Sequence, residues 1–211
     1  MLRITEIFYS LQGESTFVGL PTIFVRLTGC PLRCQYCDTA YAFSGGSKKS
    51  FDDILLEIKK YNTKYITITG GEPLAQKDVL ELMQKLCDLG YILSIETSGA
   101  FDISPIDSRV TRVMDIKTPD SKECHRNLLT NLDHLDKTDE VKFVICSKDD
   151  YNWSKGFILK HDLANKSQIL FSPCNGDVNP TDLADWIIQD QLNVRFQHQL
   201  HKTLWGDVSG K

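Results

Sequence analysis

The sequence predicts an α/β fold built on a mostly parallel sheet in a single domain. Short runs rich in β-branched and aromatic residues recur along the 211 residues, and amphipathic helical patterns lie between several of them. No internal repeat and no low-complexity linker divides the chain. Alternating strands and helices are typical of parallel sheets, which are either open or closed into a barrel.

Eight segments have the pattern of buried strands. They are short, enriched in Val, Ile, Thr, Tyr and Phe, and often bounded by turn-forming residues. In chain order they are Ile4–Tyr9, Thr22–Leu27, Tyr65–Thr69, Ile92–Glu96, Arg112–Ile116, Val141–Ile145, Gln168–Phe171 and Val194–Gln197.

Two helices are predicted by their ends as well as by their periodicity. Ser50 and Asp53 form a capping box before Phe51–Tyr61. In Asp78–Leu89 apolar residues recur at helical spacing, and Gly90 is the expected residue after the helix. Weaker helical patterns cover Tyr151–Leu163 and Thr181–Gln189, Cys124–Lys137 is ambiguous, and Ser44–Ser47 is predicted to be an exposed loop.

Composition excludes several classes of function. The formal net charge of −4 argues against a protein that clamps a nucleic-acid backbone. The longest apolar runs fall far short of the roughly 18 residues of a membrane helix. The N-terminal segment has the pattern of a strand rather than of a secretion signal. We therefore expect a cytoplasmic protein with neither a membrane nor a nucleic-acid partner.

Three of the seven cysteines, Cys30, Cys34 and Cys37, lie within eight residues. In a reducing compartment such a cluster indicates metal binding rather than disulfides. Zinc would need a fourth ligand, and neither Asp38 nor any histidine lies at zinc-ribbon spacing. An iron–sulfur cluster held by three cysteines leaves one iron open for another ligand. Of the remaining cysteines, Cys146 has apolar neighbours and is interpreted as a core residue, as is Cys87.

Polar motifs follow directly on the predicted strands. The carboxyl ends of parallel strands share one rim, and functional sites are built there. The motifs are the three-cysteine loop, Thr69–Pro73, Glu96–Gly99, Asp115–Pro119, Ser172–Asn175 and Gln199–Lys202.

Each motif also has a plainer interpretation. The glycines of Thr69–Pro73 admit close approach of a ligand, but Gly-Gly and Glu-Pro also form ordinary turns. Lys117 either pairs with Asp115 or holds a ligand carboxylate. Arg26 lies among apolar residues and needs an anion, from the protein or from a substrate. The Leu11–Ser15 loop is either solvated or shaped for the edge of a heterocycle.

Together these residues resemble the radical S-adenosylmethionine (SAM) superfamily, through Cys-x3-Cys-x2-Cys with Tyr36 and through Gly-Gly-Glu-Pro. More narrowly, the chain is similar to the 7-carboxy-7-deazaguanine synthase family of the queuosine pathway, from residue 4 to about 205. This resemblance implies an abbreviated, incomplete (βα)6-type barrel with a radical SAM core, and a homodimer. The motifs that carry it are Phe8–Glu14, Pro21–Cys30, Cys37–Thr39, Thr69–Pro73, Glu96–Gly99 and Gln199–Lys202.

The resemblance also implies the cofactors. Cys30, Cys34 and Cys37 would hold a [4Fe–4S] cluster whose open iron is chelated by SAM, and an electron from a flavodoxin or ferredoxin would start SAM cleavage. Thr39 would bind Mg²⁺, which suits a hard cation with few protein ligands. Further SAM contacts would come from Tyr36, Asp38, Gly71, Glu72, Glu96, Lys117, Thr118, Pro119, Ser172, Pro173, Cys174 and Asn175.

The implied reaction converts 6-carboxy-5,6,7,8-tetrahydropterin to 7-carboxy-7-deazaguanine by hydrogen abstraction and radical ring contraction, with loss of ammonia and catalytic use of SAM. The chain would then divide into a substrate loop (8–20), a cluster loop (29–40) and a C-terminal substrate segment (197–211). The implied substrate contacts are Leu11, Gln12, Gly13, Glu14, Arg26, Thr69 and His201.

Two alternatives remain open. A glycyl-radical enzyme activase shares the cluster motif but leaves Leu11–Glu14, Arg26 and Thr39 without a role. A zinc-stabilised binding module needs no reaction at all. Ser15 stands where the family often has Gly, which matters if this position requires positive φ. The tail Leu204–Lys211 looks flexible, so no substrate role is assigned to the terminal carboxylate.

Overall fold

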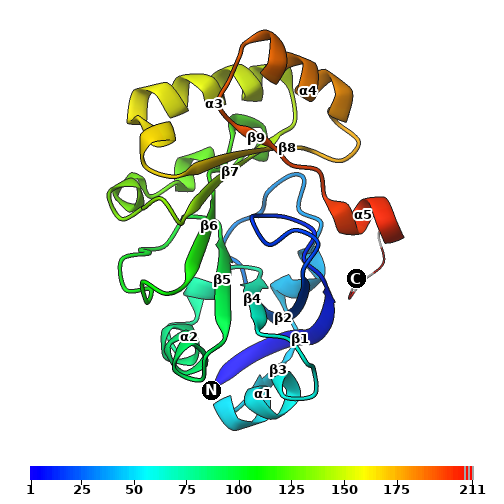
Figure 1. Cartoon of the computed structure of the whole chain (residues 1–211), viewed down its shortest axis with the longest axis vertical. Helices are drawn as coiled ribbons and strands as arrows, with labels where there is room; N and C mark the ends of the chain where they lie inside the picture. The colour runs from blue at the N-terminus through cyan, green and yellow to red at the C-terminus, as the bar shows by residue number, and fades with distance from the viewer. Residues whose placement is uncertain (207, 209, 211) are drawn as a thin grey trace.

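The computed structural model describes residues 1–206, 208 and 210, and at its centre lies one nine-stranded sheet (Figure 1). The strand order is β3-β1-β2-β4-β5-β6-β7-β8-β9. The strands are β1 (Leu2–Leu11), β2 (Pro21–Leu27), β3 (Ser47–Lys49), β4 (Tyr65–Gly70), β5 (Ile92–Thr97), β6 (Thr111–Asp115), β7 (Glu140–Ile145), β8 (Gln168–Pro173) and β9 (Arg195–Phe196).

From β2 to β9 every neighbouring pair of strands is parallel, whereas β1 runs antiparallel to both β2 and β3. Six of the parallel strands, β2 and β4 to β8, form the centre of the sheet. Within the described residues the two edge strands, β3 and β9, do not pair with each other. The predicted incomplete barrel in a single domain is therefore confirmed.

Four helices lie around the outside of the sheet, and α5 lies apart from them, next to the loop that follows β1 (Figure 1). The crossover from β5 to β6 has no helix, and the crossover from β6 to β7 contains only 3-10 turns. For this reason the segment Cys124–Lys137 showed neither helical nor strand periodicity. The helices are α1 (Phe51–Ile58), α2 (Val79–Asp88), α3 (Lys148–His161), α4 (Pro180–Gln189) and α5 (Leu200–Trp205).

The helix ends follow the predicted capping chemistry where the sequence signal was strong. Ser50 and Asp53 bond each other's backbone N–H groups, both at 3.1 Å, and Gly90 has a φ of 85°. Helix α3 begins earlier than predicted because Ser147 is its N-cap and accepts a hydrogen bond from Asp150 N at 3.1 Å.

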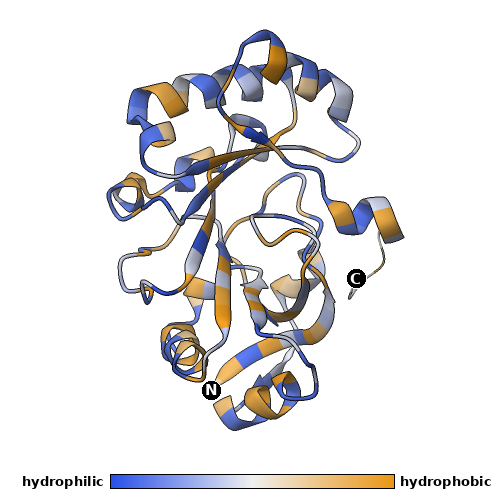
Figure 2. Cartoon of the chain, viewed as in Figure 1, coloured by the Kyte–Doolittle hydropathy of each residue, from blue (hydrophilic) through white to orange (hydrophobic). Residues whose placement is uncertain are grey.

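Alternation along the strands divides the sheet into an apolar and a polar face. Ile66 and Ile68 of β4 pack in the core, and Thr69 faces the other side. In β7, Val141 and Phe143 are fully buried in the core while Lys142 between them points away from it. The hydropathy colouring shows the apolar residues of the strands and of the covering helices (Figure 2). The helices thus cover one face, and the other face is left for chemistry.

Two short elements were not predicted. Ser47 belongs to β3, which pairs with β1, so the exposed loop predicted over Ser44–Ser47 is wrong at its last residue. The tail that looked flexible begins inside α5, and its residues 207, 209 and 211 lie outside the described residues. Both elements are too short for periodicity to indicate them. Among the described residues, no helix is long and apolar enough to cross a membrane.

Candidate active site

A cavity of about 720 Å³ opens at the carboxyl ends of the parallel strands, on the polar face of the sheet. It is lined by the loop after β1, the cysteine loop after β2, the ends of β4 to β8 and the start of α5. The predicted site residues that line it are Leu11, Gln12, Gly13, Glu14, Arg26, Cys30, Cys34, Tyr36, Cys37, Asp38, Thr39, Thr69, Gly71, Glu96, Lys117, Ser172, Cys174, Asn175 and His201.

The three loop cysteines are half-buried in the wall of this cavity. A single tetrahedral zinc would hold sulfur atoms about 3.8 Å apart, as follows from Zn–S bonds of about 2.3 Å. Among the described residues, the three metal-ligating atoms that lie mutually within 4.8 Å belong to a different group, Cys146, Cys174 and Asp177. The three loop cysteines do not belong to that group.

Burial raises the pKa of Cys34 to about 11 and also raises the pKa of Cys30. Both side chains are therefore thiols at neutral pH until a metal displaces their protons.

Gly71 fits the cluster loop rather than an ordinary turn. A Cβ atom at Gly71 would lie 2.3 Å from the Gly29 carbonyl oxygen and 2.8 Å from Cys30 Cβ. Gly71 N donates to the Leu27 carbonyl at 3.2 Å, and Glu72 N donates to the Gly29 carbonyl at 2.8 Å. The sequence left room at this glycine for a ligand to approach closely. In the structure, the group that approaches Gly71 is the backbone next to Cys30.

Four predicted cofactor contacts lie behind the cavity wall. The fully buried Glu72 carboxylate accepts hydrogen bonds from Leu74 N, Thr97 Oγ1 and Ser98 N at 3.0, 2.9 and 2.7 Å, so its oxygens are used within the protein. The buried Thr118 hydroxyl lies within hydrogen-bond distance of Asp150 and of the Val144 carbonyl. The four predicted cofactor contacts that do not line the cavity are Glu72, Thr118, Pro119 and Pro173.

Two buried polar atoms near the cysteine loop lack a partner within the described part of the chain. They are the Tyr36 hydroxyl and Asp115 Oδ1, and both residues line the cavity. The other Asp115 oxygen lies 2.8 Å from Lys117 Nζ. Although burial favours the neutral amine, Asp115 raises the pKa of Lys117. Buried unpaired groups of this kind fit a polar ligand such as SAM, which brings its own donors and acceptors.

On the opposite side of the cavity, Glu14 joins three distant segments. Its carboxylate forms a short ion pair with Lys142 of β7 and accepts a hydrogen bond from Gln199 Nε2 at 2.6 Å. Burial raises the pKa of Glu14, but the Lys142 ammonium outweighs this and holds it below the ordinary value. Burial and the nearby Glu14 charge raise the pKa of Glu96, whose carboxylate accepts from Thr69 Oγ1 at 2.8 Å.

Sequence reasoning missed Lys142. This lysine lies in an otherwise apolar strand, Val141–Ile145, and that position was the one signal that could have identified it. Burial alone would lower the pKa of Lys142. The charges of Glu14 and Asp115 outweigh burial and raise this pKa above its ordinary value, so Lys142 remains charged. It supplies the cation that lets two carboxylates, the buried Glu14 and the half-buried Glu96, face the same cavity.

Gly13 and His201 are matched to each other. A Cβ atom at Gly13 would lie 2.0 Å from His201 Nδ1, and Leu200 N donates to the Gly13 carbonyl at 3.0 Å. Burial lowers the pKa of His201, so the ring is neutral near pH 7. The C-terminal segment is thereby fixed against the loop after β1.

Arg26 forms the ion pair within the protein that one of its two sequence-based interpretations expects. Its Nε lies 2.8 Å from Glu6 Oε1, and the guanidinium lies 5.8 Å from the ring centres of both Phe8 and Tyr41. It also lines the cavity. The ion pair therefore orients Arg26 without removing it from the site.

The loop between β1 and β2 is held by its own polar groups. Gln12 Nε2 donates to Thr67 Oγ1 at 2.9 Å, while its Oε1 accepts from Glu14 N at 3.2 Å. Ser15 has a φ of 66°, so the position that differs from the family does require the left-handed region.

Comparison with known proteins points to one family. The radical SAM superfamily matches residues 24–152. Proteins named 7-carboxy-7-deazaguanine synthase are 43% identical in Koribacter versatilis, over 97% of this chain and 97% of the relative, and 40% identical in Chlorobaculum tepidum, over 97% and 94%. The crystal structure of QueE from Escherichia coli superposes with a TM-score of 0.78 at 26% identity, covering 95% of this chain and 94% of that one.

Proposed function

The chain belongs to the 7-carboxy-7-deazaguanine synthase family of the radical SAM superfamily, and we propose that it converts 6-carboxy-5,6,7,8-tetrahydropterin to 7-carboxy-7-deazaguanine. The observation that carries this proposal is that the three-cysteine loop and the buried Glu14–Lys142 pair line one cavity. A [4Fe–4S] cluster with SAM supplies the radical chemistry when both are bound. The named relatives favour this reaction over glycyl-radical activation.

The cluster side of the cavity would bind the cofactors. Cys30, Cys34 and Cys37 would hold the cluster, and the unpaired Tyr36 hydroxyl and Asp115 carboxylate oxygen would meet polar groups of SAM. The Ser172–Asn175 segment would form the far wall. Glu72 and Thr118 would act from behind this wall, by holding the loops that touch SAM.

The opposite side would bind and orient the substrate. The Arg26 ion pair uses Nε, and its terminal nitrogens have no hydrogen-bond partner among the described residues, which supports capture of the substrate carboxylate. The Leu11–Glu14 loop and Thr69 would contact the pterin ring. His201, neutral and half-buried, would complete the pocket. Holding the substrate C–H near the radical source and excluding water is the protein's part in the reaction.

The magnesium assignment rests on Thr39, which lines the cavity and whose hydroxyl lies 3.4 Å from Asp38 Oδ1. We expect Thr39→Ala to weaken stimulation by Mg²⁺ while leaving iron content unchanged. Thr39→Ser should restore the metal dependence because it restores the oxygen ligand. Equal Mg²⁺ dependence in all three proteins would remove Thr39 from the site.

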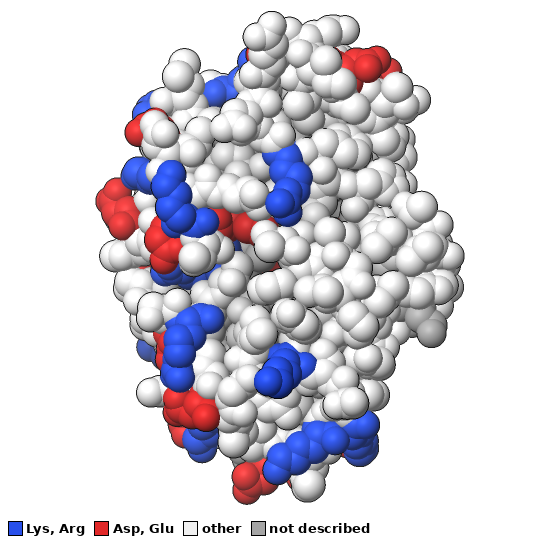
Figure 3. All heavy atoms as spheres, viewed as in Figure 1, with Lys and Arg blue, Asp and Glu red and all other residues white. Residues whose placement is uncertain are grey.

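Two partners complete the proposal. A flavodoxin or ferredoxin would deliver the electron. A second copy of the chain would form a homodimer, which is supported by the largely uncharged surface around α5 on the right of Figure 3. On the same face, charges of both signs mix on the left, without the continuous basic field that would hold a nucleic-acid backbone. Light scattering coupled to size-exclusion chromatography tests the dimer.

Anaerobic turnover of cluster-reconstituted protein tests the function. The mixture contains dithionite, SAM, Mg²⁺ and 6-carboxytetrahydropterin, and mass spectrometry follows the product and the SAM. We expect more product than SAM lost, and none with Cys34→Ala. Cys87→Ala is the matched control, since this thiol lies on α2 and away from the cavity. Release of 5′-deoxyadenosine without deazaguanine product would contradict the proposed substrate.

A further inference from the structure

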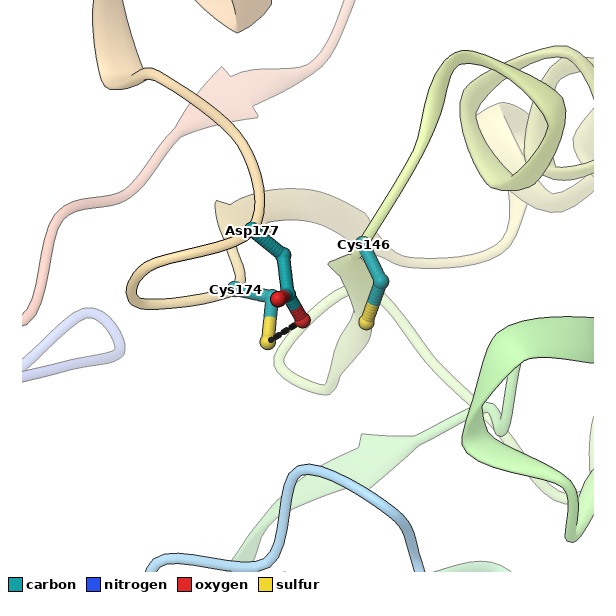
Figure 4. A group of neighbouring side chains, drawn as sticks. All are labelled: Cys146, Cys174 and Asp177. Atoms are coloured by element: carbon teal, nitrogen blue, oxygen red, sulfur yellow. Dashed lines mark hydrogen bonds between the residues drawn. The ribbon is translucent and has the colours of Figure 1, made fainter.

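A second group of metal-ligating side chains lies at the rim, apart from the cysteine loop. The ligand atoms of Cys146, Cys174 and Asp177 all lie within 4.8 Å of one another, and the two cysteine side chains point the same way, with the Asp177 carboxylate beside Cys174 (Figure 4). We propose that these three residues bind one soft divalent cation of the zinc class. This site goes beyond the proposed reaction and does not depend on it.

The register of the sheet brings the two thiols together. Strands β7 and β8 pair in parallel with Val144 opposite Ser172 and Ile145 opposite Pro173. Cys174 N donates to the Ile145 carbonyl at 2.9 Å, so the ladder continues one step and sets Cys146 beside Cys174. In-register neighbours on parallel strands point to the same face. The pair is therefore fixed by the sheet itself rather than by a mobile loop.

The third ligand is placed by a tight turn. Both Asp177 N and Val178 N approach the Cys174 carbonyl, at 3.2 and 3.3 Å. This turn returns the Asp177 carboxylate to the thiols, and Cys174 Sγ donates to Asp177 Oδ2 at 3.1 Å. On the other side, Asp150 Oδ2 accepts from Cys146 N at 3.2 Å and anchors that residue to the start of α3.

The donor set selects the class of cation. Two sulfur ligands and one carboxylate oxygen suit zinc rather than the hard ions Mg²⁺ and Ca²⁺, which prefer oxygen ligands. Tetrahedral zinc places such ligands roughly 3.5 to 3.8 Å apart, within the spread of these three atoms. Binding would release the two thiol protons to solvent. Water would take the fourth position, since Cys174 and Asp177 line the main cavity and the ion is reachable from it.

This assignment replaces the interpretation of Cys146 as a core residue. The side chain is half-buried, whereas Cys87 on α2 belongs to the hydrophobic core. An ion at this site would tie the end of β7 to the loop after β8. It would therefore stiffen the wall of the cavity that Ser172 and Asn175 also line.

Zinc titration of the full-length, cluster-reconstituted enzyme tests the site. The protein is equilibrated anaerobically with Zn²⁺ and a competing chelator, desalted, and analysed for zinc and iron. We expect one zinc per chain in addition to unchanged cluster iron. Cys146→Ser, Cys174→Ser and Asp177→Asn should each weaken zinc binding by more than about tenfold, because even indirect changes around a metal have effects of that size.

Cys124→Ser is the matched control, because that half-buried thiol lies outside the group and should leave zinc affinity unchanged. Asp177 is exposed, so Asp177→Asn keeps the test valid even if a cysteine variant misfolds. Zinc affinity in all three variants equal to that of the unmodified protein would overturn the proposal. Zinc uptake only with a matching loss of iron would also overturn it, since the metal would then be in the cluster loop.

Discussion

The two sides of the cavity are built in different ways. On the cluster side, neighbouring backbone segments hold each other. Glu72 N donates a hydrogen bond to the Gly29 carbonyl, and the backbone at Gly71 packs so closely against the cysteine loop that no Cβ would fit. On the substrate side, charged side chains hold the segments, with Glu14 between Lys142 and Gln199. The cluster side is thus specified by short motifs, and the substrate side by long-range electrostatics. Mutations should separate the two sides through iron content and activity.

The largest effect is expected from Gly71→Ala. The added Cβ would meet backbone atoms of the cluster loop at 2.3 Å, and backbone cannot rotate away as a side chain can. We expect iron content after reconstitution to fall to near zero, and turnover with it. Iron analysis and the visible absorbance of the cluster measure this. Gly156→Ala in α3, where a Cβ meets nothing within 4 Å, should retain full iron. Normal iron content in Gly71→Ala would show that close backbone packing does not hold the cluster side, and the contrast between the two sides would fail.

Lys142→Met tests the substrate side. Removing one partner of a buried ion pair destabilises a protein by about 3–5 kcal/mol, because the other charge is left unpaired. We expect kcat/KM to fall by about a hundredfold or more, which corresponds to about 2.7 kcal/mol, while iron content stays normal. Lys155→Met is the control, since its partner Asp190 is exposed and such pairs contribute about 1 kcal/mol or less.

The pH profile of Lys142→Met distinguishes positioning from simple destabilisation. Lys142 lowers the pKa of Glu14 and opposes the rise in the pKa of Glu96. Without it, both carboxylates should take up protons at higher pH, so the acid limb of the activity profile should move upward. A lower rate with an unmoved acid limb would make Lys142 structural only.

The same contrast explains what sequence alone could predict. Buried strands and the cysteine loop were found because period, turn residues and spacing are local properties. Lys142 was missed because its role arises from Glu14, which is 128 positions away in the chain. Glu72 was predicted to contact the cofactor, but only the folded chain shows that Ser98 and Leu74 use its carboxylate. The pairing of Cys146 with Cys174 likewise needs the register of two strands.

Gly13→Ala should have an intermediate effect confined to the substrate side. The new Cβ would displace the His201 ring, which can move because it is a side chain. We expect kcat/KM to fall by about tenfold, or about 1.4 kcal/mol, with normal iron and little loss of stability. In a His201→Ala background the same change should have almost no further effect, since the clash is gone. Additive losses in the double variant would place the effect of Gly13 elsewhere.

The smallest effect is expected from Ser15→Gly, and it has the opposite sign. Ser15 is buried with a φ of 66°, a conformation that is unfavourable for non-glycine residues by about 1 kcal/mol. Its hydroxyl accepts a hydrogen bond from Phe17 N at 3.3 Å, which the variant loses. The free energy of unfolding should therefore rise by about 0.5 kcal/mol, measured in urea on the cluster-reconstituted protein. Gln191→Gly, at a φ of 49° and away from the cavity, should gain a similar amount. If only the Gln191 variant is stabilised, the contacts that Ser15 makes in the loop after β1 contribute more stability than its positive φ costs.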